Sequence, residues 1–524
     1  MADKKHYCDV LVIGSGIAGL SAAITAADLG LDVVVVTKEP ELTESNTYYA
    51  QGGIVCLGQD DSPELLINDI MSAGDGISNP EAVHLIAHEG PALVEGFLVK
   101  KLNVPFTRCE KGDAFEYAQE GSHSRRRILH HMDSTGSAIE LSLEKKVREM
   151  KNIRVKSNHT AVDLLAIPHH STNPLALYME PQCIGAYVLN NENGAVDMVF
   201  SSYTVLATGG LGRVFLHTTN PQCATGDGFA MAARAGARLI NMEYIQFHPT
   251  SLFHKDADGF LISEALRGEG ARLLTKEGEP FMDKYSPLAD LAPRDVVSRA
   301  IYEEMLKRGD AYVYLDIANF AAAVDIKKRF PSIYEKCLSL DIDITESPIP
   351  VVPAAHYSCG GVHVDSWGRT SLKNLYAVGE VSATGLHGAN RLASTSLLEG
   401  LVWGIRAARN IAANFEHTKT YEESEIPEWI YPDKEEDADP ALVHQDWLYM
   451  RSTMWNYVGI IRTVKRLERA TADLQYLANR IDDFYRKVHL NGQIVSLRNG
   501  IETALLVARA AFTNRKSTGS HFIA

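Results

Sequence analysis

Apolar and polar positions near the N-terminus predict a strand, a helix and a second strand in close succession. Val10 to Ile13 is a short β-branched run, and an alanine-rich apolar helix is expected from Gly19 to Leu29. Asp32 to Thr37 forms a second β-branched run. Two strands joined by a helix at this spacing form a βαβ unit, so the pattern implies a parallel sheet.

The hydrophobic pattern changes three times along the rest of the chain. Residues 198–208 end in another strand, and residues 240–350 mix helices with several prolines and many charges. Glycine-rich sequence returns over 359–400, and apolar residues at helical spacing dominate 447–511. The charged segment 422–440 contains three prolines, which is typical of a linker.

Composition narrows the classes of function. The chain has 524 residues, so more than one domain is expected. Its formal net charge is -15, and an acidic surface disfavours binding to nucleic acid. An anionic substrate would need a locally basic pocket, so any arginine in such a pocket is a candidate substrate-binding residue.

Cysteine usage and hydropathy bear on location. Seven cysteines are scattered without a C-x-x-C pair, which favours a reducing compartment over a disulfide framework. No apolar run approaches the length of a membrane span, and no signal-type stretch precedes the first strand. A cytoplasmic protein is expected, and no metal site is predicted.

A glycine-rich string lies between the first strand and the helix. Gly14-Ser15-Gly16-Ile17-Ala18-Gly19 fits G-x-G-x-x-G, which lets a backbone approach a pyrophosphate at a helix N-terminus. Alone the string could be a structural turn, but its position favours a dinucleotide site. The second strand ends in Thr37-Lys38 instead of the expected acidic residue, so Lys38 could contact the adenosine portion or a phosphate.

Two later strings favour FAD over NAD. Leu206 to Gly210 resembles the strand-turn with which two-dinucleotide-type flavoproteins contact their FAD. Tyr376 to Glu380 puts an acidic residue after a strand, where such proteins hold the ribityl chain. An NAD dehydrogenase requires neither string.

Longer strings carry a more specific resemblance, and they occur in one order over most of the chain. They are residues 45–53, 224–228, 243–250, 263–270, 292–299, 356–362 and 385–392. In these strings the sequence resembles the succinate dehydrogenase/fumarate reductase flavoprotein family.

The resemblance implies an α/β fold: a Rossmann-like FAD-binding domain, an inserted α+β capping domain and a C-terminal helical bundle. The expected boundaries are 1–238 and 353–418 for the FAD-binding domain, 239–352 for the capping domain and 419–524 for the helical domain. The active site would lie between the FAD and the capping domain, whose movement would admit substrate.

The resemblance also assigns cofactor residues. Besides the glycine string and Lys38, they are Asn46, Thr47, Tyr48, Tyr49, Ala50, Gln51, Gly52, Gly53, Asp227, Glu380, Ser396 and Leu397. A helix is expected to start near Ser396, where free N–H groups would favour negative charge on a reduced flavin, or would form an ordinary helix cap.

The expected substrate is a four-carbon dicarboxylate, because arginine's rigid fork suits a carboxylate at each end. The positions that resemble the family's carboxylate clamp are His248, His356 and Arg391, with Ser263 and Glu264 beside them. Arg294 matches the family's proton-transfer arginine, although a free guanidinium holds its proton tightly. Arg267 and Arg299 could equally be structural.

Two positions distinguish branches of the family. Respiratory members usually attach FAD to a histidine where this chain has Asn46, so noncovalent FAD is expected. The string Gln119 to His130 resembles a segment of L-aspartate oxidases, and Glu120 falls where those enzymes place a glutamate near the substrate amino group. A charge-assisted bond of this kind contributes about 1.5–3 kcal/mol. The alternative is a surface loop of mixed charge.

The resemblance therefore implies oxidation of L-aspartate to iminoaspartate, with hydride transfer to FAD and reoxidation by oxygen or fumarate. That reaction would begin NAD (quinolinate) synthesis, with possible functional coupling to quinolinate synthase. The alternative within the family is a fumarate reductase or succinate dehydrogenase flavoprotein subunit. A tRNA-binding flavoprotein would need a basic face, and the cations at 462–469 are read more simply as a solvated helix face.

Overall fold

A mainly parallel sheet forms the centre of the molecule in the computed structural model, which describes residues 5–109, 113–321, 324–416, 421–431 and 436–524. The strand order is β6-β2-β1-β9-β8-β7, and β16 also pairs with β9. The strands are β1 (Lys5–Ile13), β2 (Val33–Val36), β6 (Ile153–Lys156), β7 (His159–Ile167), β8 (Gln182–Asn190), β9 (Val196–Leu206) and β16 (Leu375–Ala377). The strands β6, β2, β1, β9 and β16 are parallel, whereas β9, β8 and β7 form an antiparallel meander.

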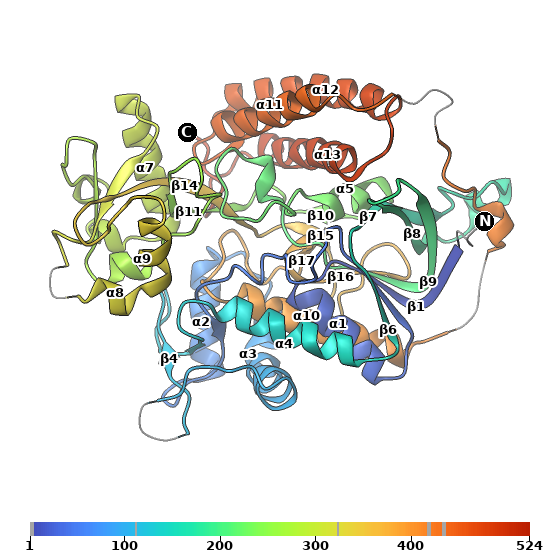
Figure 1. Ribbon diagram of the computed structural model, residues 1–524, viewed down its shortest axis with the longest axis horizontal. Helices are drawn as coiled ribbons and strands as arrows, with labels where there is room; N and C mark the ends of the chain where they lie inside the picture. Colours follow the sequence, from blue (N-terminus) through green and yellow to red (C-terminus); the bar gives the residue numbers. More distant parts are fainter. Residues whose placement is uncertain (1–4, 110–112, 322–323, 417–420, 432–435) are drawn as a thin grey trace.

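Three helices, α1 (Ile17–Asp28), α4 (Thr135–Glu149) and α10 (Ser396–Ala413), lie along one another beside this sheet (Figure 1). Small residues let α1 and α10 pack closely. A Cβ atom at Gly404 would lie 2.5 Å from the carbonyl oxygen of Ala18. Almost every residue of α1 is buried, which accounts for its alanine-rich sequence.

A second, antiparallel sheet lies at one end of the molecule (Figure 1). Its order is β11 (Ile245–Leu252), β14 (Ile349–Ser358), β13 (Val313–Asp316) and β12 (Arg272–Leu274). Helices α6 (Ala265–Gly268), α7 (Arg294–Arg308), α8 (Ile326–Arg329) and α9 (Pro331–Leu338) accompany it. We refer to residues 239–352 as the inserted segment. The boundary expected at 352/353 falls inside β14.

Three long helices form the C-terminal part of the chain: α11 (Pro440–Val458), α12 (Val464–Tyr485) and α13 (Gly492–Thr513). Each begins at a side chain that caps its N-terminus, namely Asp439, Thr463 and Asn491. Helix α13 packs on α5 (Asp227–Arg234) and β7. The boundary expected at 418/419 and residues 432–435 of the expected linker lie outside the described residues.

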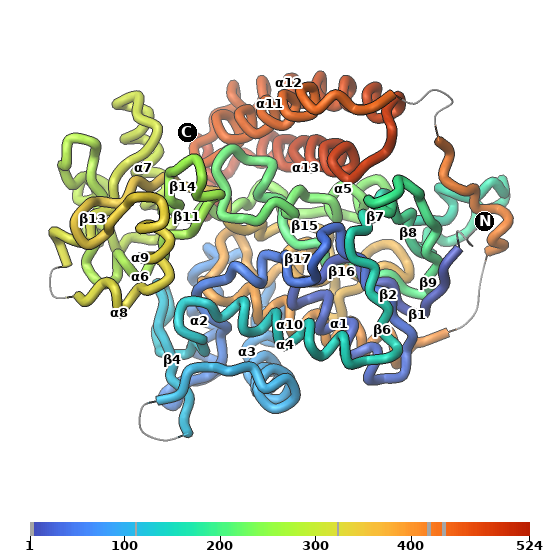
Figure 2. The backbone as a smooth tube through the Cα atoms, in the orientation of Figure 1, coloured from blue at the N-terminus to red at the C-terminus, as the bar shows by residue number. Residues whose placement is uncertain are grey.

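Smaller elements complete the fold. They are β3 (Ile54–Val55), α2 (Pro63–Ala73), α3 (Pro80–Leu93), β4 (Tyr117–Ala118), β5 (Ile128–Leu129), β10 (Leu239–Ile240), β15 (Gly361–His363) and β17 (Ser382–Ala383). None of the helices in the described part of the chain combines the length and apolar character that crossing a bilayer requires. In Figure 2 the C-terminus lies between the inserted segment and the C-terminal helices.

Candidate active site

One cavity of about 490 Å³ brings together nearly all of the residues singled out from the sequence. It is lined by the glycine loop after β1, the 44–53 segment, β11, α7 and the N-terminus of α10. All seven predicted catalytic residues line it, as do all predicted cofactor residues except Gly19 and Tyr48. Gly19 instead permits close packing, because a Cβ atom there would lie 2.2 Å from the carbonyl oxygen of Gly14.

The glycine loop opens the N-terminus of α1 into the cavity. Gly14 has a φ of +116°, and a Cβ atom there would lie 2.1 Å from the carbonyl oxygen of Ala207. The N–H group of Ile17 donates to Thr47 Oγ1 at 3.0 Å, while Gly16 supplies no side-chain cap. Backbone donors therefore remain available where a pyrophosphate would bind.

Lys38 is held by protein side chains. Its Nζ donates to Thr225 Oγ1 and to Asp227 Oδ2, both at 2.7 Å. Asn499 of α13 donates to the other oxygen of Asp227 at 3.0 Å. The lysine after β2 therefore fixes Asp227, and both side chains line the same end of the cavity.

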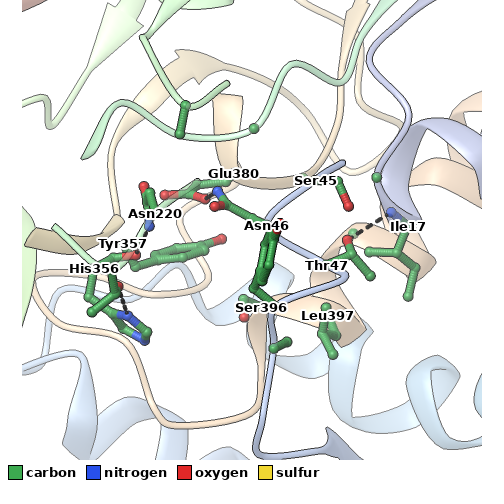
Figure 3. Close-up of a pocket in the computed structure, with 18 of the residues that line it drawn as sticks. Ile17, Ser45, Asn46, Thr47, Asn220, His356, Tyr357, Glu380, Ser396 and Leu397 are labelled. Carbon is green, nitrogen blue, oxygen red and sulfur yellow. Dashed lines mark hydrogen bonds between the residues drawn. The ribbon is translucent and has the colours of Figure 1, made fainter. Parts of the chain in front are cut away.

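Asn46 and Glu380 both line the cavity, and their side chains contact each other (Figure 3). Asn46 Nδ2 donates to Glu380 Oε2 at 3.1 Å, and Ser358 N donates to Glu380 Oε1 at 3.0 Å. Burial raises the pKa of Glu380 to about 7, against the opposing effects of the Ser358 N–H, Arg391 and Asn46.

We expect Glu380→Gln to stabilise the flavin-free protein at pH 8 relative to pH 5. The folded carboxyl keeps its proton up to about pH 7, whereas an unfolded glutamate, whose pKa is 4.5, loses it at lower pH. The free energy of unfolding of the wild type should therefore fall as pH rises through this window, by about 1–3 kcal/mol. Chemical denaturation of both proteins at both pH values measures it, and equal pH dependence would contradict it.

Two arginines share one half-buried glutamate, Glu264. Arg294 Nε, at the start of α7, donates to Glu264 Oε2 at 2.6 Å. Arg267 Nη2 lies 3.6 Å from Glu264 Oε1, and Arg267 Nη1 donates to the Asp290 carbonyl at 2.6 Å. Burial alone would lower the pKa of Arg294, but the carboxylates of Glu264 and Glu120 outweigh it and raise that pKa. The guanidinium of Arg294 is therefore held in its charged form.

Two of the histidines that line the cavity, His248 and His356, lie beside each other, with ring centroids 5.4 Å apart. Burial, together with nearby arginines, lowers the pKa of both His248 and His356 well below 6.5, so both rings are neutral at physiological pH. Thr250 N donates to His248 Nδ1 at 3.2 Å, which leaves the ring proton on Nε2. Thr219 Oγ1 shares a 2.7 Å hydrogen bond with His356 Nδ1.

Arg391 lies over the ring of Tyr357, with its Cζ 4.8 Å from the ring centroid. The Tyr357 hydroxyl donates to Glu399 Oε2 at 2.7 Å, and His387 Nε2 lies 3.0 Å from the same oxygen. Burial lowers the pKa of Arg391, with Arg294 acting in the same direction. A cation in this position favours a negatively charged ligand, because none of its acceptors in the described residues is a carboxylate.

Glu120 reaches the cavity from the segment after β4. Ser394 Oγ donates to Glu120 Oε2 at 2.7 Å, and Ser394 holds a φ of +57° in the loop before α10. A Cβ atom at Gly52 would lie 2.4 Å from Glu120 Oε1, so this glycine leaves room for the carboxylate. The cavity therefore brings the carboxylate of Glu120 together with the arginines and histidines.

The donors that line the cavity fit a flavin dinucleotide. Helix α10 begins at Ser396 as expected, and Thr395 supplies no side-chain cap, so a second helix N-terminus opens into the same space. Buried Arg294 Nη1 and Arg391 Nε have no hydrogen-bond partner among the described residues. Two open helix ends suit a diphosphate and an electron-rich ring, and unpaired guanidinium donors suit carboxylates.

Residues that sequence reasoning overlooked hold the clamp side chains in place. They are Thr219 beside His356, Tyr357 beneath Arg391 and Ser394 beside Glu120. Tyr357 lies in one of the strings that carry the resemblance, and Ser394 closely follows another. This proximity is the one sequence signal that could have identified them. Arg299 does not line the cavity and pairs with Asp295 at 2.7 Å. Ser263 Oγ accepts from Ala265 N at 3.3 Å.

Comparison with known proteins agrees with this geometry. Residues 9–397 match the family model described as FAD binding domain, and residues 448–523 match the one described as fumarate reductase flavoprotein C-terminus. The L-aspartate oxidase of Pseudomonas aeruginosa is 44% identical, covering 99% of this chain and 96% of its own length. That of Halobacterium salinarum is 43% identical, covering 98% and 96%.

Solved structures show the same fold. A quinol fumarate reductase flavoprotein from E. coli superposes with a TM-score of 0.86 at 27% identity, covering 99% of this chain and 91% of that one. A Mycobacterium smegmatis Sdh1 chain gives a TM-score of 0.83 at 32% identity, covering 99% and 89%. The chain therefore belongs to the FAD-binding flavoprotein family that contains the fumarate reductase flavoproteins and the L-aspartate oxidases.

Proposed function

We propose that the chain oxidises L-aspartate to iminoaspartate, with bound FAD supplying the hydride acceptor and with fumarate or oxygen as the final electron acceptor. The observation that carries the proposal is the presence of Glu120 in the same cavity as Arg294, Arg391, His248 and His356. Relatives named L-aspartate oxidase, over 40% identical across nearly the whole chain, support this choice of substrate.

The cationic side of the cavity binds the two carboxylates. Arg294 and Arg391 offer charged donors that are already desolvated, so little further desolvation opposes the binding of an anion. His248 adds a neutral Nε2–H donor, because its Nδ1 is occupied by Thr250 N. These groups hold the dicarboxylate in one orientation and exclude water around it.

Glu120 selects among dicarboxylates. Its carboxylate would accept a hydrogen bond from the ammonium group of aspartate, and Ser394 fixes its orientation. Succinate and fumarate have no cationic group, so the same carboxylate repels them. A site intended for succinate alone gains nothing from Glu120, which favours the amino acid over the alternative of a succinate dehydrogenase subunit.

The proposal includes noncovalent FAD. Asn46 stands where a histidine link would form, and its amide is bonded to Glu380. It also includes the domain division into 1–238 with 353–418, 239–352 and 419–524, which the separate second sheet and the C-terminal helices support. The reaction would be the first step of NAD (quinolinate) synthesis, with coupling to quinolinate synthase, in the cytoplasm.

Steady-state turnover separates the two candidate substrates. With fumarate or oxygen as acceptor, we expect kcat/KM for L-aspartate to exceed that for succinate by at least about 10-fold, because only aspartate pairs with Glu120. Faster oxidation of succinate would transfer the assignment to the succinate dehydrogenase alternative.

A further inference from the structure

The last eleven residues, 514–524, form a segment that we call the C-terminal tail. It leaves α13 and returns along the loop between α11 and α12, where Arg462 N donates to the Phe522 carbonyl at 3.1 Å and Ala524 N donates to the Arg462 carbonyl at 2.8 Å. The tail is well anchored, because His521 is fully buried and bonds through Nδ1 to the guanidinium of Arg462.

On one side the tail contacts the loop that carries Arg391. The N–H and hydroxyl groups of Ser520 both donate to the Ala389 carbonyl, at 3.0 and 2.8 Å. Ala389 precedes Arg391 by two residues, and the Arg391 carbonyl in turn accepts from Gln246 Nε2 at 2.8 Å. The tail therefore helps to fix the backbone from which Arg391 enters the cavity.

On its other side the tail contacts α7, which begins with Arg294. The Cζ of Arg299 lies 5.1 Å from the centroid of the half-buried Phe522 ring, a cation–π arrangement. Arg299 follows Arg294 by five residues, about 1.4 turns of the same helix. Figures 1 and 2 show the C-terminus between α7 and the C-terminal helices.

We propose that Ser520 and Phe522 are positioning residues that set the spacing between the two arginines of the carboxylate clamp. The tail contacts the Arg391 loop through Ser520 and the Arg294 helix through Phe522, while neither residue lines the cavity. This inference rests on the proposed function, because it presupposes that the clamp binds a dicarboxylate.

The tail is not the only support of α7. Tyr302 of α7 packs edge-on against Trp455 of α11, with ring centroids 6.0 Å apart, and Ser298 Oγ donates to the Phe247 carbonyl at 3.4 Å. Loss of Phe522 should therefore leave the helix docked and change only the position of its first turns. The expected effect falls on substrate affinity, with folding and FAD content preserved.

The test uses the oxidised holoenzyme with fumarate as the probe, because fumarate cannot reduce the flavin. We expect Phe522→Ala to raise the fumarate Kd, measured from the perturbation of flavin absorbance, by about 3–10-fold. The value of kcat at saturating aspartate should stay within about 2-fold, and the Tm and flavin content should match the wild type. Arg299→Ala should raise the Kd similarly, and the double variant should add little to either single change.

Phe512→Ala is the matched control, because Arg515 lies over the Phe512 ring at 4.4 Å but belongs to neither side of the clamp. An unchanged fumarate Kd in Phe522→Ala would overturn the inference, as would equal weakening in Phe512→Ala. Independent, additive effects of Phe522→Ala and Arg299→Ala would overturn it too. If the wild-type protein bound neither fumarate nor L-aspartate, the proposed function itself would fail.

Discussion

Replacing Arg294 with lysine is expected to lower fumarate reduction by about 10²–10⁴-fold while FAD remains bound. Lysine keeps the positive charge but loses the planar guanidinium, whose Nε donates to Glu264 at 2.6 Å. Nη1 of the same group is buried without a partner among the described residues and is free for a substrate carboxylate or a reacting atom. Activity with a reduced dye as electron donor measures the loss.

Arg308→Lys is the control for this change. It makes the same substitution on the same helix at a side chain that does not line the cavity and that pairs with Glu277 at 2.5 Å and Glu304 at 3.3 Å. Its activity should stay within about 3-fold of the wild type. Comparable losses in both variants would indicate that α7 is merely destabilised, and normal activity in Arg294→Lys would remove Arg294 from the catalytic machinery.

Glu120→Gln is expected to lower kcat/KM for L-aspartate by about 10–150-fold, which corresponds to the loss of about 1.5–3 kcal/mol of a charge-assisted hydrogen bond. Glutamine keeps the shape of the side chain and can still accept from Ser394 Oγ, so the change isolates the charge. Fumarate reduction should not fall, because fumarate has no ammonium group to pair with Glu120 and the variant removes a charge that repels it.

Glu116→Gln provides the matched control, since Glu116 is exposed just before β4 and does not line the cavity. Steady-state kinetics with both substrates on all three proteins gives the comparison. Equal losses in aspartate oxidation and fumarate reduction in Glu120→Gln would remove the assigned role of this residue as the partner of the substrate amino group.

Local pattern was enough to predict the βαβ unit and the start of α10, because apolar runs and glycine punctuation report local backbone structure directly. The sequence pattern does not predict the first half of β1. Residues 5–9 are mostly polar, and they form a strand by pairing with β9. The sequence predicts that Lys38 contacts the cofactor but gives no sign of its bond to Asp227, because the two residues are far apart in the chain. Long-range pairing of this kind has no local sequence signal.

The residues of the candidate site likewise fall into those that the sequence could predict and those that it could not. Resemblance singled out His248, Arg294, His356 and Arg391, because the side chains that contact substrate lie in distinctive strings. The residues that hold them could not be identified, since the positive φ of Ser394 and the packing of Tyr357 under Arg391 exist only in the folded chain. For Arg299 the sequence favours neither a binding nor a structural role, and its contacts with Asp295 and Phe522 exist only in the folded chain.

The central claim is that this ring of arginines and imidazoles, together with Glu120, holds L-aspartate for oxidation by a noncovalently bound flavin. The most direct measurement mixes the purified holoenzyme with L-aspartate without oxygen and follows the visible absorbance of the flavin. Bleaching by L-aspartate, much faster than by succinate at equal concentration, is the predicted result. Bleaching by succinate alone, or by neither compound, would contradict the account.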